Sequence, residues 1–247
     1  MAFITGTPTL SRFDLYTSNA TAPSGYSIGA LHFGVNGKAF RLSLVGASAL
    51  VMGNLLQESA EDTSYENMAV LATAIGSEYL NVTNGTATIT SAQFEGGSIS
   101  VYTAGGVAVG DEYTITGITG TLTTGGALQV YLDRPLRAAF TTSAKVNMKR
   151  SPWSGVIQAP ATTQTGIAVG VALAASTLAQ YAWVQSKGVG AVLSDGSTFA
   201  VGSDLGTPSG TAGCASVYVA GTTHQRIGVS RQAAASAKCI SALIQID

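Results

Sequence analysis

Four carboxylates within one short segment form the densest set of chemically active side chains in the sequence. They are Glu58, Glu61, Asp62 and Glu66, in the stretch QESAEDTSYE. A pair of acids can hydrolyse a glycosidic bond when a cleft holds the two groups several Å apart. All four lie in one polar segment, so a solvated face or a subunit contact is the expected role. A calcium loop is not indicated, because the D-x-[DN]-x-[DN]-G spacing is missing.

One serine has the local sequence of a hydrolase nucleophile. Residues 25–29 read GYSIG, which matches the nucleophile-elbow pattern with Ser27 at its centre. That elbow needs a strand before the serine and a helix after it. Here a Pro-Ser-Gly turn precedes Ser27 and a β-like segment follows, so we do not expect Ser27 to be catalytic.

The sequence offers few ligands for a metal or a cofactor. It contains two histidines, His32 and His224, and two cysteines, Cys214 and Cys239. These cannot build a multi-histidine zinc site, and neither Cys-x-x-Cys nor His-Glu-x-x-His occurs. A disulfide framework is not expected, and Cys239 lies in an alternating segment that predicts a buried thiol. We therefore predict no metal, no cofactor and no enzymatic activity.

Phosphate-binding loops are also missing. The stretch SKGVGAVL, residues 186–193, has two glycines but lacks the Walker lysine and the third glycine of the dinucleotide fingerprint. Three aromatic residues, Trp153, Tyr181 and Trp183, could form a platform on which a sugar stacks. A core or interface anchor is the commoner role for such side chains, and both interpretations stay open.

Composition excludes several classes of partner. Charged residues make up 10% of the chain, against about 25% in an average soluble domain. The net charge of −1 provides no field that would attract nucleic acid or an anionic membrane. The small basic group of Lys145, Lys149 and Arg150 is expected to be a solvated loop. No secretory signal is visible and the longest apolar run is about half a membrane span, so we expect a soluble protein made in a cytoplasm.

The elements that would position these residues are predicted to be strands. Residues 1–30 are predicted to be an extended arm, with an ordinary first strand as the alternative. Asn36-Gly37 between apolar runs predicts a hairpin, because both turn positions need positive φ. Residues 57–75 are ambiguous: Tyr65, Met68, Leu71 and Ile75 have helical spacing, but an acidic loop followed by a strand is the preferred interpretation. From residue 77 to 147 the pattern is β throughout, including a strand over 86–90 and inward-facing Leu128, Val130 and Leu132.

The C-terminal third is predicted to be a second β domain. We place a linker at 151–165, where Pro152 and Pro160 occur, between domains at 31–150 and 166–247. A strand ending near Lys187, a turn, and a hairpin closed at Asp195-Gly196 are expected. The last segment alternates, with inward-facing residues Ile240, Ala242, Ile244 and Ile246. Segments 170–185 and 228–245 resemble each other and indicate two strand–turn–strand units.

A repeated phrase marks the ends of the predicted strands. Apolar residues run into Gly53, Gly110 and Gly202, and each glycine is followed by a small polar or acidic residue. Glycine tolerates the positive φ that a tight turn or bulge needs. We predict structural turns at these glycines and at Asn36, Gly37, Asp195 and Gly196. The fold class is therefore all-β, built from small antiparallel sandwich or barrel modules with little helix.

Several phrases together resemble virion proteins of tailed bacteriophages. They are GVNGKAFRLSLVGASALVMGNLLQ, LDRPLRAAFTTSAKVNM with SPWSGVI, and AQYAWVQSKGVGAVLSDGSTFAVGS. The phrase AVGSDL is similar to the compact β-clip-like or β-tulip-like folds of head decoration proteins. The resemblance implies a homotrimeric cement protein on the capsid surface of the virion, with the major capsid protein as its partner. It also implies that the N-terminal arm contacts the capsid, through Phe3, Ile4, Leu10, Arg12, Phe13 and Tyr16.

Two other virion roles remain as alternatives. The first is a receptor-binding or tail-fibre-type adhesin that binds carbohydrate through Trp153 and Trp183. The second is a major capsid or head-fibre protein. A major capsid protein is disfavoured, because the sequence shows no long amphipathic helix.

Overall fold

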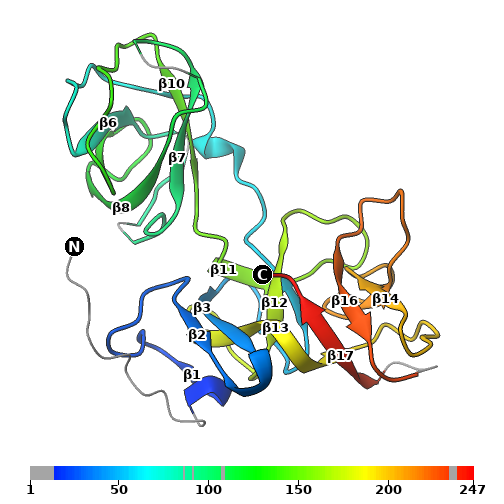
Figure 1. The fold of residues 1–247 in the computed structure, drawn as a ribbon. Helices are drawn as coiled ribbons and strands as arrows, with labels where there is room; N and C mark the ends of the chain where they lie inside the picture. The colour runs from blue at the N-terminus through cyan, green and yellow to red at the C-terminus, as the bar shows by residue number, and fades with distance from the viewer. Residues whose placement is uncertain (1–13, 86, 91, 107–108, 234–237) are drawn as a thin grey trace. The chain divides into compact units, whose positions relative to one another are not determined.

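The computed structural model describes residues 14–247, apart from 86, 91, 107–108 and 234–237. The all-β prediction is confirmed, because the regular structure of the described residues consists of strands and three short 3-10 helices. The chain divides into two compact units (Figure 1). The split unit comprises the described residues up to Ala60 together with Pro152–Asp247, and the inserted unit is Glu61–Ser151.

Eleven described strands build the split unit. Two 3-10 helices, η1 (Asp14–Tyr16) and η2 (Val35–Gly37), accompany them. The strands are β1 (Ser18–Asn19), β2 (Leu31–Phe33), β3 (Ala39–Val45), β4 (Leu55–Gln57), β11 (Ser154–Gln158), β12 (Ala168–Ala172), β13 (Tyr181–Leu193), β14 (Asp204–Gly206), β15 (Ser216–Val217), β16 (Arg226–Ser230) and β17 (Cys239–Gln245).

Five of these strands close into a barrel. The ring runs β3, β13, β12, β4 and β11, and β11 pairs back onto β3. The β11–β3 contact is parallel and the other four are antiparallel. Aliphatic side chains such as Val45, Leu56, Val156 and Val184 pack together in a buried cluster contributed by these strands. Closure satisfies the backbone groups that an open sheet would leave unpaired at its edges.

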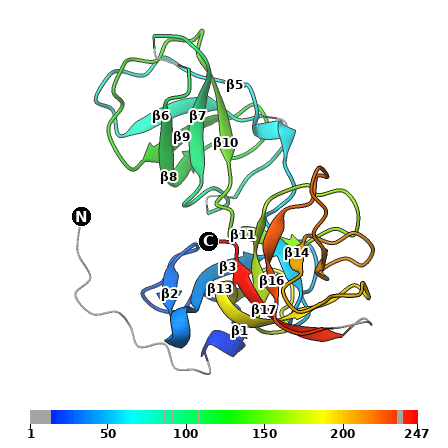
Figure 2. The ribbon, with the colours of Figure 1, turned by 45° about the vertical axis from the view of Figure 1, so that its right-hand side comes forward.

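The long strand β13 belongs to the barrel and to a further sheet. Its first half pairs with β3, from Tyr181 to Lys187, and its second half pairs with β17, from Lys187 to Leu193. Strands β16, β14 and β15 continue the sheet beyond β17, and Figure 2 shows β13, β17 and β16 side by side. A second cluster, including Phe199, Leu205 and Ile227, is buried against this part.

Strand β17 follows the predicted alternation. Ile240, Ala242 and Ile244 are buried, and the residues between them point to the other face. The same alternation puts Cys239 on the exposed face, so the prediction of a buried thiol there is wrong; Cys214 is the buried cysteine. The two similar segments do form strand–turn–strand units, since β12 pairs with β13 and β16 pairs with β17.

The inserted unit is a small barrel with its own core. It contains η3 (Thr63–Tyr65) and strands β5 (Met68–Ala69), β6 (Tyr79–Thr83), β7 (Ser98–Thr103), β8 (Glu112–Gly120), β9 (Ala127–Leu132) and β10 (Lys145–Lys149). The sheet order is β5-β10-β7-β8-β9-β6, and a bridge between Val70 and Val82 joins its two edge strands. Leu128, Val130 and Leu132 face the core as predicted, beside Phe94 and Ile115.

The unit boundaries differ from the expected division at 31–150, 151–165 and 166–247. Residues 154–158 form barrel strand β11 instead of a linker, and β4 pairs with both β11 and β12. The N-terminal strands therefore share a sheet with the C-terminal third. This pairing joins segments about a hundred residues apart, as Ile157 with Gln57 illustrates, and local sequence patterns do not report such contacts.

Three local predictions are also wrong. Residues 87–90 are not a strand, although Ile89 is buried. No turn interrupts β13 near Lys187, because Gly188 continues the strand with φ of +91°. The hairpin at Asp195-Gly196 does not form, since β14 pairs with β15 and β16 instead of β13.

The predicted turn glycines have left-handed backbones. Gly53, Gly110 and Gly202 have φ of +84°, +87° and +87°. Asn36 and Gly37, with φ of 58° and 71°, lie in η2 between the paired strands β2 and β3. Gly196 has φ of 95°, and the backbone N–H of Ser197 donates to Asp195 Oδ1 at 2.9 Å, which makes a local turn.

Candidate functional site

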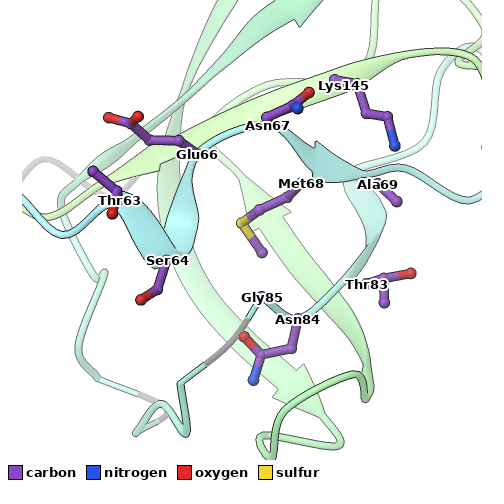
Figure 3. Close-up of a pocket in the computed structure, with 10 residues that line it drawn as sticks. All are labelled: Thr63, Ser64, Glu66, Asn67, Met68, Ala69, Thr83, Asn84, Gly85 and Lys145. Carbon is purple, nitrogen blue, oxygen red and sulfur yellow. The ribbon is translucent and has the colours of Figure 1, made fainter.

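A polar hollow of about 480 Å³ opens on the inserted unit (Figure 3). It lies where β5 and β6 separate after the Val70–Val82 bridge. Seven of its ten lining residues have hydroxyl, amide or charged side chains. The lining residues are Thr63, Ser64, Glu66, Asn67, Met68, Ala69, Thr83, Asn84, Gly85 and Lys145.

Buried contacts fix the walls of this hollow. Asn84 Nδ2 donates to the carbonyl oxygens of Ala87, Leu122 and Thr123 at 3.0, 2.9 and 2.9 Å. Gly85 lies against the carbonyl of Ser64 so closely that a Cβ would overlap it. The amide side chain of Asn84 is thus a structural tie between loops and is not available to a ligand.

An ion triad lies next to the hollow. Lys149 Nζ donates to Glu61 Oε1, and to Glu66 Oε1 at 3.3 Å. Burial acts to lower the pKa of Lys149, but the hydrogen bonds to Glu61 and Glu66 raise it overall. The hydrogen bond from Lys149 lowers the pKa of Glu61. Both acids are therefore salt-bridge partners of a lysine, and Glu61, with its lowered pKa, is not poised to donate a proton.

The structure does not assemble the four predicted acids into a catalytic pair. Glu58 belongs to the split unit, where its Oε1 accepts from the backbone N–H of Ile167 at 3.0 Å. Asp62 begins η3, and its Oδ1 accepts from the backbone N–H of Ser64 at 3.0 Å. Lys145 and Lys149 lie at the two ends of strand β10, so the predicted solvated loop at this basic group is wrong.

Ser27 and the two histidines make contacts that stabilise the fold and do not form a catalytic arrangement. Ser27 lies in a turn in which the N–H of Ala30 donates to its carbonyl, and no helix follows. His32 stacks on Phe40 with 6.4 Å between ring centroids. His224 Nδ1 lies 3.0 Å from the carbonyl oxygen of Thr207. Among the described residues, no group of three His, Cys, Asp or Glu side chains is arranged to hold a metal ion.

One carboxylate cluster was not visible as a cluster in the sequence. Asp195 Oδ2 accepts from the hydroxyls of Ser216 and Ser209, the second at 3.3 Å. Burial opposes its ionisation, but hydrogen bonds from Ser197, Ser216 and Ser209 lower the pKa of Asp195 overall. Burial, together with the charge of Asp195, raises the pKa of the Cys214 thiol. The thiol thus stays protonated, and the cluster ties loops together without an activated nucleophile.

Of the two interpretations of the aromatic residues, the structure favours core anchors over a sugar-stacking platform. Trp183 is 1% exposed and packs in a cluster with Phe40, Leu42 and Tyr26. Trp153 is half-buried, with the Arg41 guanidinium 4.6 Å from its ring centroid. These tryptophans therefore act as core anchors, and the adhesin alternative loses the sugar-stacking surface on which it was based.

Most of the predicted capsid-contact residues lie outside the described part of the chain. These are Phe3, Ile4, Leu10, Arg12 and Phe13. Tyr16 is described, belongs to η1 and is 51% exposed, whereas the adjacent Leu15 is buried in the cluster around Trp183. The described residues contain no helix long and apolar enough to cross a membrane.

Exposed apolar side chains gather on a ribbon of the split unit that the sequence analysis did not single out. Residues 46–53 and 174–179, here called the ribbon patch, run alongside each other through mutual backbone hydrogen bonds between Leu50 and Ser176, at 2.8 and 3.1 Å. Val51, Met52 and Leu178 are 57%, 58% and 58% exposed. No charged residue occurs in 46–53 or in 174–179, so the two segments of the ribbon patch carry no charge of their own.

No protein-family model, curated protein or solved structure matches this chain.

Proposed function

We propose that this chain is a bacteriophage capsid decoration protein. It binds the outer surface of the virion shell and bridges neighbouring subunits of the major capsid protein. The virion-protein resemblance of the sequence suggests this role, and the ribbon patch is the observation that carries it. Exposed apolar patches on soluble proteins mark sites of protein contact, and an uncharged patch can be buried without leaving a charge unpaired.

Such a protein works by binding energy alone. Each copy adds contacts across a subunit boundary, so the shell can open only if those contacts also break. Self-association into a homotrimer would let several ribbon patches engage the shell at once and multiply the gain through avidity. The clusters around Asp195 and Lys149 fit this role, because both are arranged as structural ties.

Particles of the phage that encodes this chain provide the test. We expect many copies spread over the shell in an electron-microscopy map, and a lower temperature of DNA release from particles stripped of the protein. Adding back the wild-type protein should restore that temperature. Adding back Met52→Lys should not, because a lysine ammonium cannot be buried unpaired in an apolar contact.

An exposed apolar residue outside the ribbon patch supplies the matched control. Val201 is 69% exposed in a turn before β14, and Val201→Lys should restore particle stability as well as the wild type does. A few copies confined to the tail would overturn the proposal and favour the adhesin alternative. Full restoration by Met52→Lys would remove the ribbon patch as the contact surface.

A further inference from the structure

Within the described part of the chain, the outer edge of strand β2 has unpaired backbone groups. β2 is the last strand on its side of the sheet and pairs with β3 alone (Figure 2). The N–H of Leu42 donates to the carbonyl of Ala30, and that of Gly34 to the carbonyl of Lys38. Because hydrogen-bonded pairs alternate along an antiparallel ladder, Leu31 and Phe33 turn their N–H and C=O groups away from β3.

The same short segment exposes apolar side chains. Leu31, Phe33 and Val35 are 38%, 72% and 65% exposed. Leu31 and Phe33 are two residues apart in the strand, so their side chains lie on one face of it. Soluble proteins protect a sheet edge by keeping it very short, or with a charged residue, a proline or a bulge. β2 is three residues long, but its sequence Leu-His-Phe carries no charged residue, proline or bulge.

We propose that β2 is a self-association edge, which pairs antiparallel with β2 of a second copy across a two-fold axis near His32. In this register Leu31 lies opposite the partner's Phe33, and Phe33 opposite the partner's Leu31. Both pairs exchange their two free N–H and C=O groups, so every unpaired backbone group at this edge finds a partner. Directly opposed side chains share a face, and each phenyl ring therefore covers a leucine.

A second copy fits this edge better than a charged partner. The strand has no Asp, Glu, Lys or Arg side chain, so it offers a charged partner no ion pair of its own. Each copy presents the same unsatisfied edge, and the two-fold arrangement satisfies both edges in one contact. Three residues a side bury much less than the roughly 1,600 Å² of a standard interface. The contact is therefore weak between free molecules and becomes effective where copies are concentrated.

The mass of the isolated protein as a function of concentration tests the proposal. Sedimentation equilibrium measures the average mass, at protein concentrations up to roughly 1 mM because the interface is below standard size. With rising concentration, the average mass should increase towards twice that of the smallest species. Phe33→Lys and Leu31→Lys should each abolish this doubling, because each lysine would lie opposite an apolar side chain of the second copy and lose its water without gaining an ionic partner. Val201→Lys, at an equally exposed apolar site, should leave the doubling unchanged.

The outcomes are distinct from those for the capsid. A wild-type mass that stays constant over the whole range would overturn the edge pairing, and so would a Phe33→Lys protein that still doubles. Tryptophan emission identical to that of the wild type shows that each variant is folded. If the smallest species is a monomer, pairing stops at two copies; a trimer carries three such edges, so its average mass would rise at least twofold. The measurement needs no capsid. The edge pairing can therefore be disproved while the decoration role stands, and the decoration role can be disproved while the edge pairing stands.

Discussion

At the scale of single residues, Asp247 illustrates how a carboxylate stabilises the split unit. Its Oδ2 accepts from Arg41 Nε at 2.8 Å, and its Oδ1 from Arg41 Nη2 at 3.1 Å. Arg41 in turn donates to the carbonyl of Gly29 at 3.0 Å and stacks on Trp153. The hydrogen bonds from Arg41 hold the pKa of Asp247 below its ordinary value, against the opposing effect of burial.

Asp247→Asn should reduce the free energy of unfolding of the split unit by about 1 kcal/mol at pH 7, given that the pair is partly exposed. A depressed folded-state pKa contributes stability above the unfolded value of about 3.9, and that contribution is lost as pH falls through the folded pKa. The curves of the two proteins should therefore converge below about pH 4. Urea unfolding followed by tryptophan emission measures this, since both tryptophans lie in the split unit.

A more exposed ion pair of the same type is the control. Asp204 accepts from Arg226 at 2.8 Å, but both side chains are nearly half exposed. Asp204→Asn should change the free energy of unfolding by only a few tenths of a kcal/mol. An Asp247→Asn difference that persists unchanged down to pH 2 would contradict the role given to Arg41.

At the scale of elements, β13 depends on a glycine where it passes from one partner to the next. Gly188 has φ of +91°, and a Cβ there would lie 2.9 Å from Lys38 Cα and 3.1 Å from the carbonyl oxygen of Gly37. Gly188→Ala should therefore cost about 3 kcal/mol of unfolding free energy, from backbone strain and overpacking together. Thermal or urea unfolding followed by tryptophan emission measures the loss.

Two other glycines separate the contribution of backbone strain from that of overpacking. Gly202 has φ of +87° with open space around it, so Gly202→Ala should cost about 1 kcal/mol from strain alone. Gly210 has neither a positive φ nor a close neighbour, and Gly210→Ala should be nearly neutral. Equal losses of unfolding free energy at Gly188 and Gly202 would mean that the contact with Lys38 does not affect stability.

The elements also show how far sequence patterns reach. Alternation correctly placed Ile240, Ala242 and Ile244 inward, because side-chain direction in a strand is a local property. Alternation could not predict the continuous strand β13, since a glycine at position 188 looks like a turn signal in the sequence. Only the pairing with β3 and β17 keeps Gly188 within a strand. The contacts of Asp195 with Ser209 and Ser216 were missed for the same reason, since the bridge between Ser194 and Ala215 brings these segments together.

At the scale of the whole molecule, the inserted unit interrupts a pair of neighbouring strands. β4 and β11 pair antiparallel, with Gln57 opposite Ile157, so residues 61–151 occupy the position of a hairpin loop. The two ends of the insertion are held near each other, because Glu61 pairs with Lys149. Domain insertions succeed at such loops when the inserted ends lie close together.

Each unit should therefore fold without the other. Replacing residues 61–151 by a short Gly-Ser linker should leave the split unit with wild-type tryptophan emission and a cooperative unfolding transition, because β4 and β11 can then join as an ordinary hairpin.

The isolated 61–151 segment should also unfold cooperatively in urea, followed by circular dichroism, since its buried cluster consists only of its own residues. Lys149→Ala in that segment, which frees its two ends, should lower its stability only slightly because the pair is exposed. If the isolated segment shows no cooperative unfolding transition, its barrel needs the split unit in order to close.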